Sequence, residues 1–84
     1  MKQAYITFRS VTFAQKAERI FKKAGLECTM QRTPKELSVR GCGYCLRIRA
    51  GSALEASRLL EGEKVDYGKL YAAKPDGGYE ELHL

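Results

Sequence analysis

The sequence of 84 residues lacks any long hydrophobic run. No apolar stretch approaches the roughly 18–20 residues that a membrane-spanning helix needs, and the N-terminus lacks the apolar stretch of a secretory signal. We therefore expect a cytoplasmic protein without a membrane partner. The hydrophobic content of 44% and the charged content of 30% are typical of a globular chain. Because 84 residues cannot supply two cores, we expect one domain over residues 1–84, with a core over about residues 4–73 and a hairpin or tail over residues 74–84.

Cysteine and histidine are also scarce, with three cysteines and one histidine. An odd number of cysteines argues against a secreted disulfide framework and favours thiol chemistry or metal binding. Zinc needs four ligands, but Cys28 is expected to face inward and His83 to lie several strands away from Cys42 and Cys45. The sequence therefore disfavours a zinc site within one chain, and leaves open a four-thiolate site shared by two chains.

Acidic residues are few in the first half of the chain. Residues 1–50 hold eleven Lys and Arg against three Glu, which is a net charge of +8. Residues 51–84 hold four Lys and Arg against seven acids, which is a net charge of −3. This division favours an anionic partner for the first half: nucleic acid, a phosphorylated or oxyanionic small molecule, or an acidic protein surface.

Alternating apolar residues predict strands, and apolar residues at helical spacing predict helices. The predicted strands cover residues 4–8, 26–31, 44–49, 65–73 and 79–84. One helix should start at the capping box of Thr12 and Gln15 and end at Gly25. A second should start at the capping box of Ser52 and Glu55 and run to about Leu60, with Gly62 as its terminator. Pro34 should end the second strand, with a loop or a single helical turn after it.

This order of elements predicts an α+β fold, a ferredoxin-like βαββαβ two-layer sandwich with strand order 4-1-3-2. A fifth strand could form a hairpin with the fourth. Both helices should cover one face of the sheet, and the uncovered face could support a homodimer. That face should carry Tyr5, Thr7, Arg9, Cys45, Arg47, Arg49, Lys69 and Tyr71. The fold hosts many functions, so the function has to come from a site.

The candidate site is the segment around Cys42. Gly41 and Gly43 flank Cys42, remove side-chain bulk and permit a positive φ, so that another molecule can approach the sulfur. Cations favour the nucleophilic thiolate over the thiol; the neighbouring ones are Arg40, Arg47 and, in space, Lys35. An exposed thiolate in a basic loop can hold a transferable sulfur or selenium atom as a persulfide or selenosulfide, without another cofactor.

Three other interpretations remain open. Cys42 and Cys45 form a CxxC pair typical of thiol–disulfide redox proteins, but residues i and i+3 of an extended segment lie about 10 Å apart, beyond the roughly 7 Å limit for a disulfide. Residues 40–47 partly match the RNA-recognition motif, yet Cys42 and Arg47 stand where bases need aromatic rings. The segment could also be a plain loop and strand without chemistry.

Several motifs together resemble a known family. They are Tyr5-Ile-Thr-Phe8, Ser10, Ala17-Glu18, Phe21-Lys-Lys-Ala-Gly25, Thr33-Pro-Lys-Glu-Leu-Ser38 and Cys42-Gly43 leading into Leu46-Arg-Ile48. Over about residues 4–72 the chain resembles the putative Se/S carrier protein-like family. The resemblance implies a non-enzymatic selenium or sulfur carrier with Cys42 as the residue that bears the atom. It implies a cysteine desulfurase or selenocysteine lyase as donor, and selenophosphate synthetase or a sulfur-transfer enzyme as acceptor.

The sequence departs from the family pattern at Cys45, where we expect a small residue other than cysteine, and in the added tail after residue 73. The second thiol leaves room for an assisting role. Cys45 could attack selenium on Cys42 to form a bridged Cys–Se–Cys species, or release the atom by forming a disulfide.

Overall fold

The computed structural model describes residues 2–37 and 43–83 and shows a small α+β protein. Its strands are β1 (Gln3–Thr7), β2 (Thr29–Arg32), β3 (Tyr44–Arg49), β4 (Leu70–Ala73) and β5 (Tyr79–Glu81). Its α-helices are α1 (Val11–Lys23) and α2 (Ala53–Gly62), and two short 3-10 helices are η1 (Lys35–Leu37) and η2 (Ala50–Ser52). Neither α-helix combines the length and the apolar character that crossing a membrane requires, within the described part of the chain.

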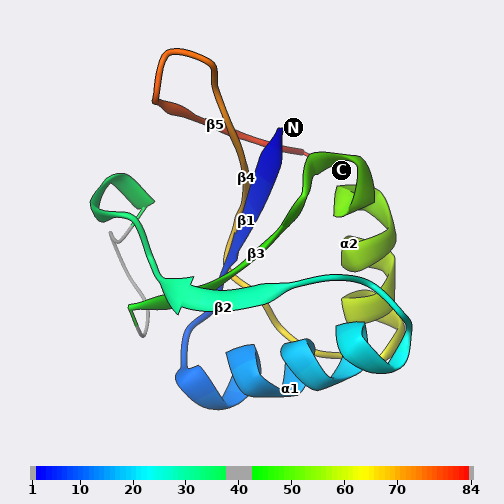
Figure 1. The fold of residues 1–84 in the computed structure, drawn as a ribbon. Helices are drawn as coiled ribbons and strands as arrows, with labels where there is room; N and C mark the ends of the chain where they lie inside the picture. The colour runs from blue at the N-terminus through cyan, green and yellow to red at the C-terminus, as the bar shows by residue number, and fades with distance from the viewer. Residues whose placement is uncertain (1, 38–42, 84) are drawn as a thin grey trace.

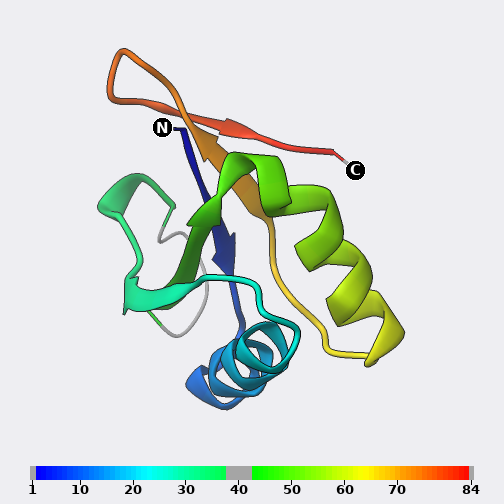
Figure 2. The same cartoon turned by 45° about the vertical axis from the view of Figure 1, so that its right-hand side comes forward.

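The five strands form one antiparallel sheet in the order β2-β3-β1-β4-β5 (Figure 1). The predicted central position of the first and third strands is confirmed, and so is the predicted hairpin between the fourth and fifth. The sheet forms one layer and the two α-helices pack against it as the second (Figure 2). This arrangement is compatible with a ferredoxin-like sandwich.

The core lies between the helices and one face of the sheet. Ala4 and Ile6 of β1 pair with Ile48 and Leu46 of β3, and all four side chains are buried. The helices contribute Ala14, Ala17 and Phe21 from α1 and Ala53, Ala56 and Leu60 from α2. Small alanines on the helices let them approach the sheet closely, so that large side chains such as Phe21 fill the space between them.

Helix α1 begins two residues earlier than the sequence predicted. Ser10 is its N-cap, in an extended conformation with φ −143°, and its Oγ accepts a hydrogen bond from the Phe13 backbone N–H at 3.3 Å. The predicted cap, Thr12, already lies within the helix. The predicted end is confirmed: Gly25 adopts φ +78°, and the Leu26 N–H donates to the Phe21 carbonyl oxygen at 2.8 Å.

Helix α2 differs from its prediction at both ends. Ser52 is the last residue of the 3-10 helix η2, with ψ near 3°, and makes no side-chain capping hydrogen bond to α2. Gly62 is the last helical residue rather than the terminator. Lys64 takes the left-handed conformation instead, with φ +56°, and the Val65 N–H donates to the Leu60 carbonyl oxygen at 2.9 Å. This bond corresponds to the one from Leu26 to Phe21 at the end of α1, but here the left-handed residue is not a glycine.

Two strands are shorter than predicted. Strand β2 starts at Thr29 rather than residue 26, although Leu26, Cys28 and Met30 face the core as expected. Strand β4 starts at Leu70 rather than residue 65. Just before it, Gly68 and Lys69 both form backbone hydrogen bonds with the single residue Thr7, outside the regular pairing of β1 with β4. The turn that joins β4 to β5 contains Gly77, which has φ +91°.

Candidate functional site

The two ends of the loop between β2 and β3 are held together. Arg32 and Tyr44 are the last paired residues of these strands, and the Thr33 N–H donates to the Gly43 carbonyl oxygen at 2.8 Å. The predicted turn after Pro34 is η1, closed by a hydrogen bond from the Leu37 N–H to the Pro34 carbonyl oxygen at 2.9 Å. The predicted site residues Arg40, Gly41 and Cys42 lie outside the described residues.

Gly43, which follows Cys42 in the sequence, has a backbone conformation that favours glycine. Its φ is +81°, while a Cβ placed on it would meet no atom within 4 Å. The requirement for glycine is therefore conformational rather than steric. A left-handed conformation costs other residues roughly 1–2 kcal/mol, so this part of the Cys42-Gly43 motif has a structural reason.

Cys45 lies on the face of β3 that points away from the helices, as predicted, where it pairs with Thr7 of β1 and Gln31 of β2. The expectation that this face is uncovered is wrong at this position, since the exposed fraction of Cys45 is 0%. Its Sγ lies 3.9 Å from the Arg32 carbonyl oxygen, within hydrogen-bonding distance for sulfur. The thiol is therefore a buried group with a backbone acceptor.

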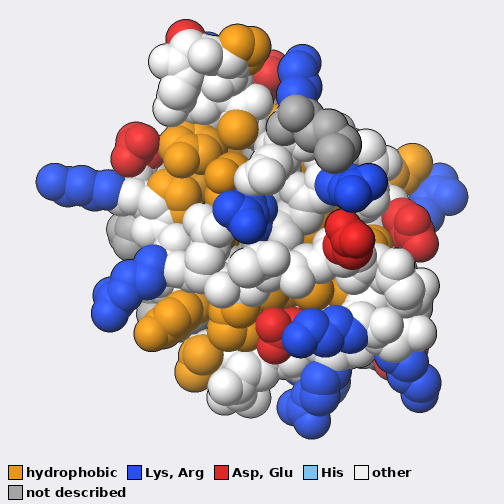
Figure 3. Space-filling model, viewed as in Figure 1, with side chains coloured by type: hydrophobic (Ala, Val, Ile, Leu, Met, Phe, Trp, Pro, Cys, Tyr) orange, Lys and Arg blue, Asp and Glu red, His pale blue; other side chains and the backbone are white. Residues whose placement is uncertain are grey.

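The hairpin of β4 and β5 contributes an aromatic side chain to this open face, which we define as the sheet face opposite the helices. The ring of Tyr79 meets the ring of Tyr5 edge-on, with centroids 5.5 Å apart. Burial raises the pKa of Tyr79, and negative charge on Tyr5, Glu36 or Cys45 raises it further. Figure 3 shows hydrophobic side chains gathered between the hairpin and η1.

The two described cations of the predicted site lie on different elements. Lys35 is exposed at the start of η1. Arg47 is half-buried in the middle of β3, between Tyr5 of β1 and Thr29 of β2. Next to the loop, the Arg32 guanidinium lies 5.8 Å from the centroid of the Tyr44 ring. The first residue of β3, Tyr44, is thus in contact with a cation from β2 at the point where the loop ends.

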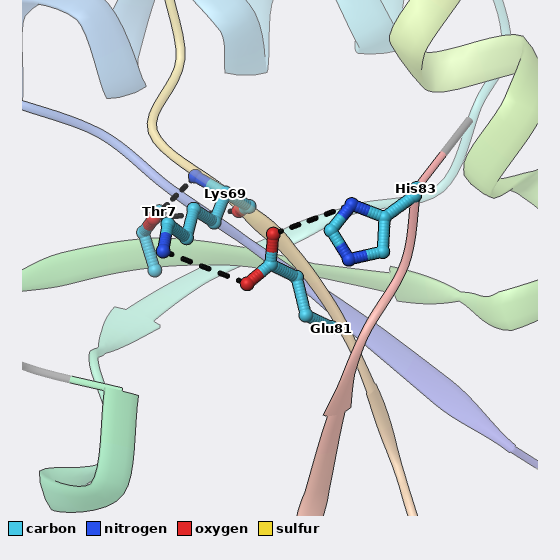
Figure 4. Close-up of polar contacts among 4 residues, drawn as sticks. All are labelled: Thr7, Lys69, Glu81 and His83. Carbon is cyan, nitrogen blue, oxygen red and sulfur yellow. Dashed lines mark hydrogen bonds and ion pairs between the residues drawn. The ribbon is translucent and has the colours of Figure 1, made fainter.

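A polar network ties β1 to the C-terminal strand (Figure 4). The Thr7 hydroxyl accepts a hydrogen bond from the Lys69 backbone N–H at 2.9 Å. The Lys69 ammonium pairs with Glu81 at 3.5 Å, and Glu81 lies 3.6 Å from His83. Sequence reasoning missed this network, because its members are up to 76 positions apart and no local motif joins them.

The third cysteine is a poor nucleophile. Partial burial raises the pKa of Cys28, and Glu18 raises it further, while Lys22 acts in the opposite direction. The thiol therefore stays protonated at neutral pH. Among residues 2–37 and 43–83, no three metal-binding side chains come together.

A comparison with protein-family models matches residues 3–72 to the family described as "Putative Se/S carrier protein-like". The matched range includes Cys42, Gly43 and Cys45, and it ends before β5. The comparisons with curated proteins and with solved structures gave no match.

Proposed function

Because this chain belongs to the Se/S carrier protein-like family, we propose that it is a small thiol-based carrier that holds selenium or sulfur on Cys42. The family match over residues 3–72 is the observation that carries this proposal. The cargo is bound covalently, so no cofactor is required. The carrier itself catalyses no reaction; a donor enzyme loads it and an acceptor enzyme unloads it, in the cytoplasm.

The properties of the other two cysteines favour Cys42 as the carrier thiol. A thiolate is the attacking species in sulfur transfer, and it must be reachable. Cys45 is fully buried, and burial together with Glu18 raises the pKa of Cys28. Neither thiol meets both requirements in this conformation. Cys42 is the remaining cysteine, and Lys35, Arg40 and Arg47 are the cations that we propose to favour its thiolate.

We propose the following transfer step. The Cys42 thiolate attacks the outer sulfur of a donor persulfide, and the donor cysteine leaves as a thiolate. Cys42 then carries a persulfide, which an acceptor thiolate attacks in the same way. A cysteine desulfurase or selenocysteine lyase would be the donor, and selenophosphate synthetase or a sulfur-transfer enzyme would be the acceptor.

Cys45 has a proposed assisting role that needs local opening. Once ionised, its thiolate would attack the inner sulfur of the Cys42 persulfide, form a Cys42–Cys45 disulfide and expel HS⁻, or HSe⁻ from the selenium adduct. A second thiol compound would then reduce the disulfide. Because Cys45 is fully buried, this step would follow a local opening of the sheet face and would not compete with loading.

Loading can be tested by incubating the reduced protein with selenite and glutathione and weighing it by mass spectrometry. We expect selenium adducts on the parent chain and on Cys28→Ala, and strongly reduced loading of Cys42→Ala. The Cys28→Ala variant is the matched control, since it removes a thiol that we place outside the carrier role. Equal loading of Cys42→Ala and the parent would show that the assignment of Cys42 is wrong.

An insulin-reduction assay separates the carrier from a thiol–disulfide reductase. A carrier should leave insulin intact in the presence of a reductant, whereas a reductase uses its CxxC pair to cleave the insulin disulfides. Rapid reduction that is lost in both Cys42→Ala and Cys45→Ala would favour the redox interpretation instead.

A further inference from the structure

A groove opens at the end of the sheet away from Gly43. It exists because β2 pairs with β3 only from Thr29 onward, whereas the chain from Gly25 to Cys28 runs apart from the last residues of β3. The resulting cavity has a volume of about 600 Å³. That volume lies within the usual range of small-molecule sites, about 300–1,000 Å³.

Four cations from separate parts of the fold line this groove. They are Lys2 before β1, Lys22 in the last turn of α1, and Arg47 and Arg49 on β3. Glu27 is the acidic residue in the lining, so the formal charge of the groove is +3. Figure 3 shows basic side chains over this part of the surface. Such a concentration of charge favours a ligand with more than one negative charge.

The existing ion pairs leave these cations available to a ligand. Arg49 lies 3.3 Å from Glu27, whose side chain is 81% exposed, and Lys22 lies 3.6 Å from Glu18. Exposed pairs of this kind contribute little stability, typically about 0–1 kcal/mol. An anion inside the groove would therefore displace the carboxylates at low cost and gain charge-assisted hydrogen bonds.

The remaining lining suits a ligand with an organic part. Leu26 and Ile48 form apolar surface, and Cys28 contributes a thiol that is uncharged at neutral pH and does not repel an anion. A bare phosphate ion would leave most of the cavity empty. We propose that this groove binds a phosphate-bearing small molecule, with Lys22, Arg47 and Arg49 on the phosphate and the apolar residues against the rest. This site lies at the end of the sheet away from Gly43, and Arg47, in the middle of β3, is the residue that it shares with the cations we propose for the carrier thiol.

The proposal can be tested by titrating ¹⁵N-labelled full-length protein with pyrophosphate at constant ionic strength, then with inorganic phosphate and with AMP. We expect saturable shifts of the backbone amides of residues 25–29 and 47–49. Phosphate alone should bind more weakly than AMP, because Leu26 and Ile48 contact the organic part of the ligand. Equal affinities of phosphate and AMP would overturn this role of the apolar residues.

Matched double variants separate the groove from general attraction to a basic protein. Lys22→Gln with Arg49→Gln removes two lining cations, and Lys16→Gln with Lys23→Gln removes two exposed α1 cations that do not line the groove. We expect the first pair to weaken pyrophosphate binding by at least about tenfold and the second to change it little. No saturable shifts, or equal weakening by both pairs, would overturn the proposal. If both double variants also bound single-stranded RNA with equal affinity, anion binding would be assigned to the basic surface as a whole and not to the groove.

Discussion

At the scale of single residues, Thr7 is unusually constrained for a threonine on the open face. Its exposed fraction is 8%, its hydroxyl accepts from the Lys69 N–H at 2.9 Å, and its carbonyl oxygen accepts from the Gly68 N–H at 2.7 Å. These contacts bring the backbone of residue 68 directly against Thr7. Gly68 is therefore needed for close approach rather than for a special φ.

We expect Gly68→Ala to lower the free energy of unfolding by about 1–3 kcal/mol, because overpacking forces the neighbours to shift. A Cβ on residue 68 would lie 2.6 Å from Thr7 Oγ1 and 3.2 Å from its carbonyl oxygen. Urea unfolding measures the change. Gly62→Ala is the control: its Cβ would meet open space at the end of α2, so this variant should be neutral or up to about 1 kcal/mol more stable. Equal stability of Gly68→Ala and the parent would contradict the contact.

At the scale of elements, the two α-helices end in the same way, with one residue in the left-handed conformation, but the residue type differs. Gly25 closes α1 at φ +78°, which costs glycine nothing. Lys64 closes α2 at φ +56°, a conformation that is strained for a side-chain-bearing residue. The hydrogen bonds to the Phe21 and Leu60 carbonyl oxygens are equivalent. The sequence prediction placed the end of α2 at Gly62 because glycine is the residue type that most often adopts the left-handed conformation after a helix.

Lys64→Gly should therefore stabilise the protein by about 0.5–1 kcal/mol, since relief of left-handed strain exceeds the added freedom of glycine in the unfolded chain. The urea midpoint should rise while the slope of the transition stays constant. Lys64→Ala keeps the strain and loses only the charge, so its stability should stay near that of the parent. A lower midpoint for Lys64→Gly would mean that the Lys64 side chain stabilises the turn more than its conformation costs.

At the scale of the whole molecule, the C-terminal hairpin changes what the open face can do. The family match ends at residue 72, and β5 adds a strand beyond it. The Tyr79 ring of β5 packs edge-on against the Tyr5 ring of β1, and Cys45 of β3 lies on the same face of the sheet. The face is thus partly covered within one chain. A homodimer through the rest of this face stays a prediction.

We expect Tyr79→Ala to speed the modification of Cys45 by a thiol reagent by about three- to tenfold, because the lost aromatic pair is worth roughly 0.5–1.5 kcal/mol toward keeping the hairpin closed. Digestion and mass spectrometry give the rate for each cysteine separately. Tyr79→Phe keeps the ring and should label at the rate of the parent, and Cys28 should be unaffected in both variants. Unchanged labelling of Cys45 in Tyr79→Ala would show that other contacts bury it.

Much of the fold was predictable because its signals are local. Alternation in residues 44–49 and helical spacing in residues 13–24 reflect which side chains must face a core. These periods can be recognised without knowing which other elements pack against the segment. The glycine at residue 43 and the break at Pro34 were also predictable, since glycine permits a positive φ and proline cannot donate a hydrogen bond to a strand. The helix ends at Thr12 and Gly62 were wrong because neighbouring residues, Ser10 and Lys64, took those roles.

By itself, the sequence determined the order of the strands and α-helices, the inward face of the first four strands, and a family motif containing Cys42 and Gly43. Only the tertiary structure decided that Cys45 is buried, that Gly68 packs on Thr7, and that four distant cations converge on one groove. The physical reason is sequence distance. Burial and charge convergence arise from contacts between elements, and no short stretch of residues encodes both sides of such a contact.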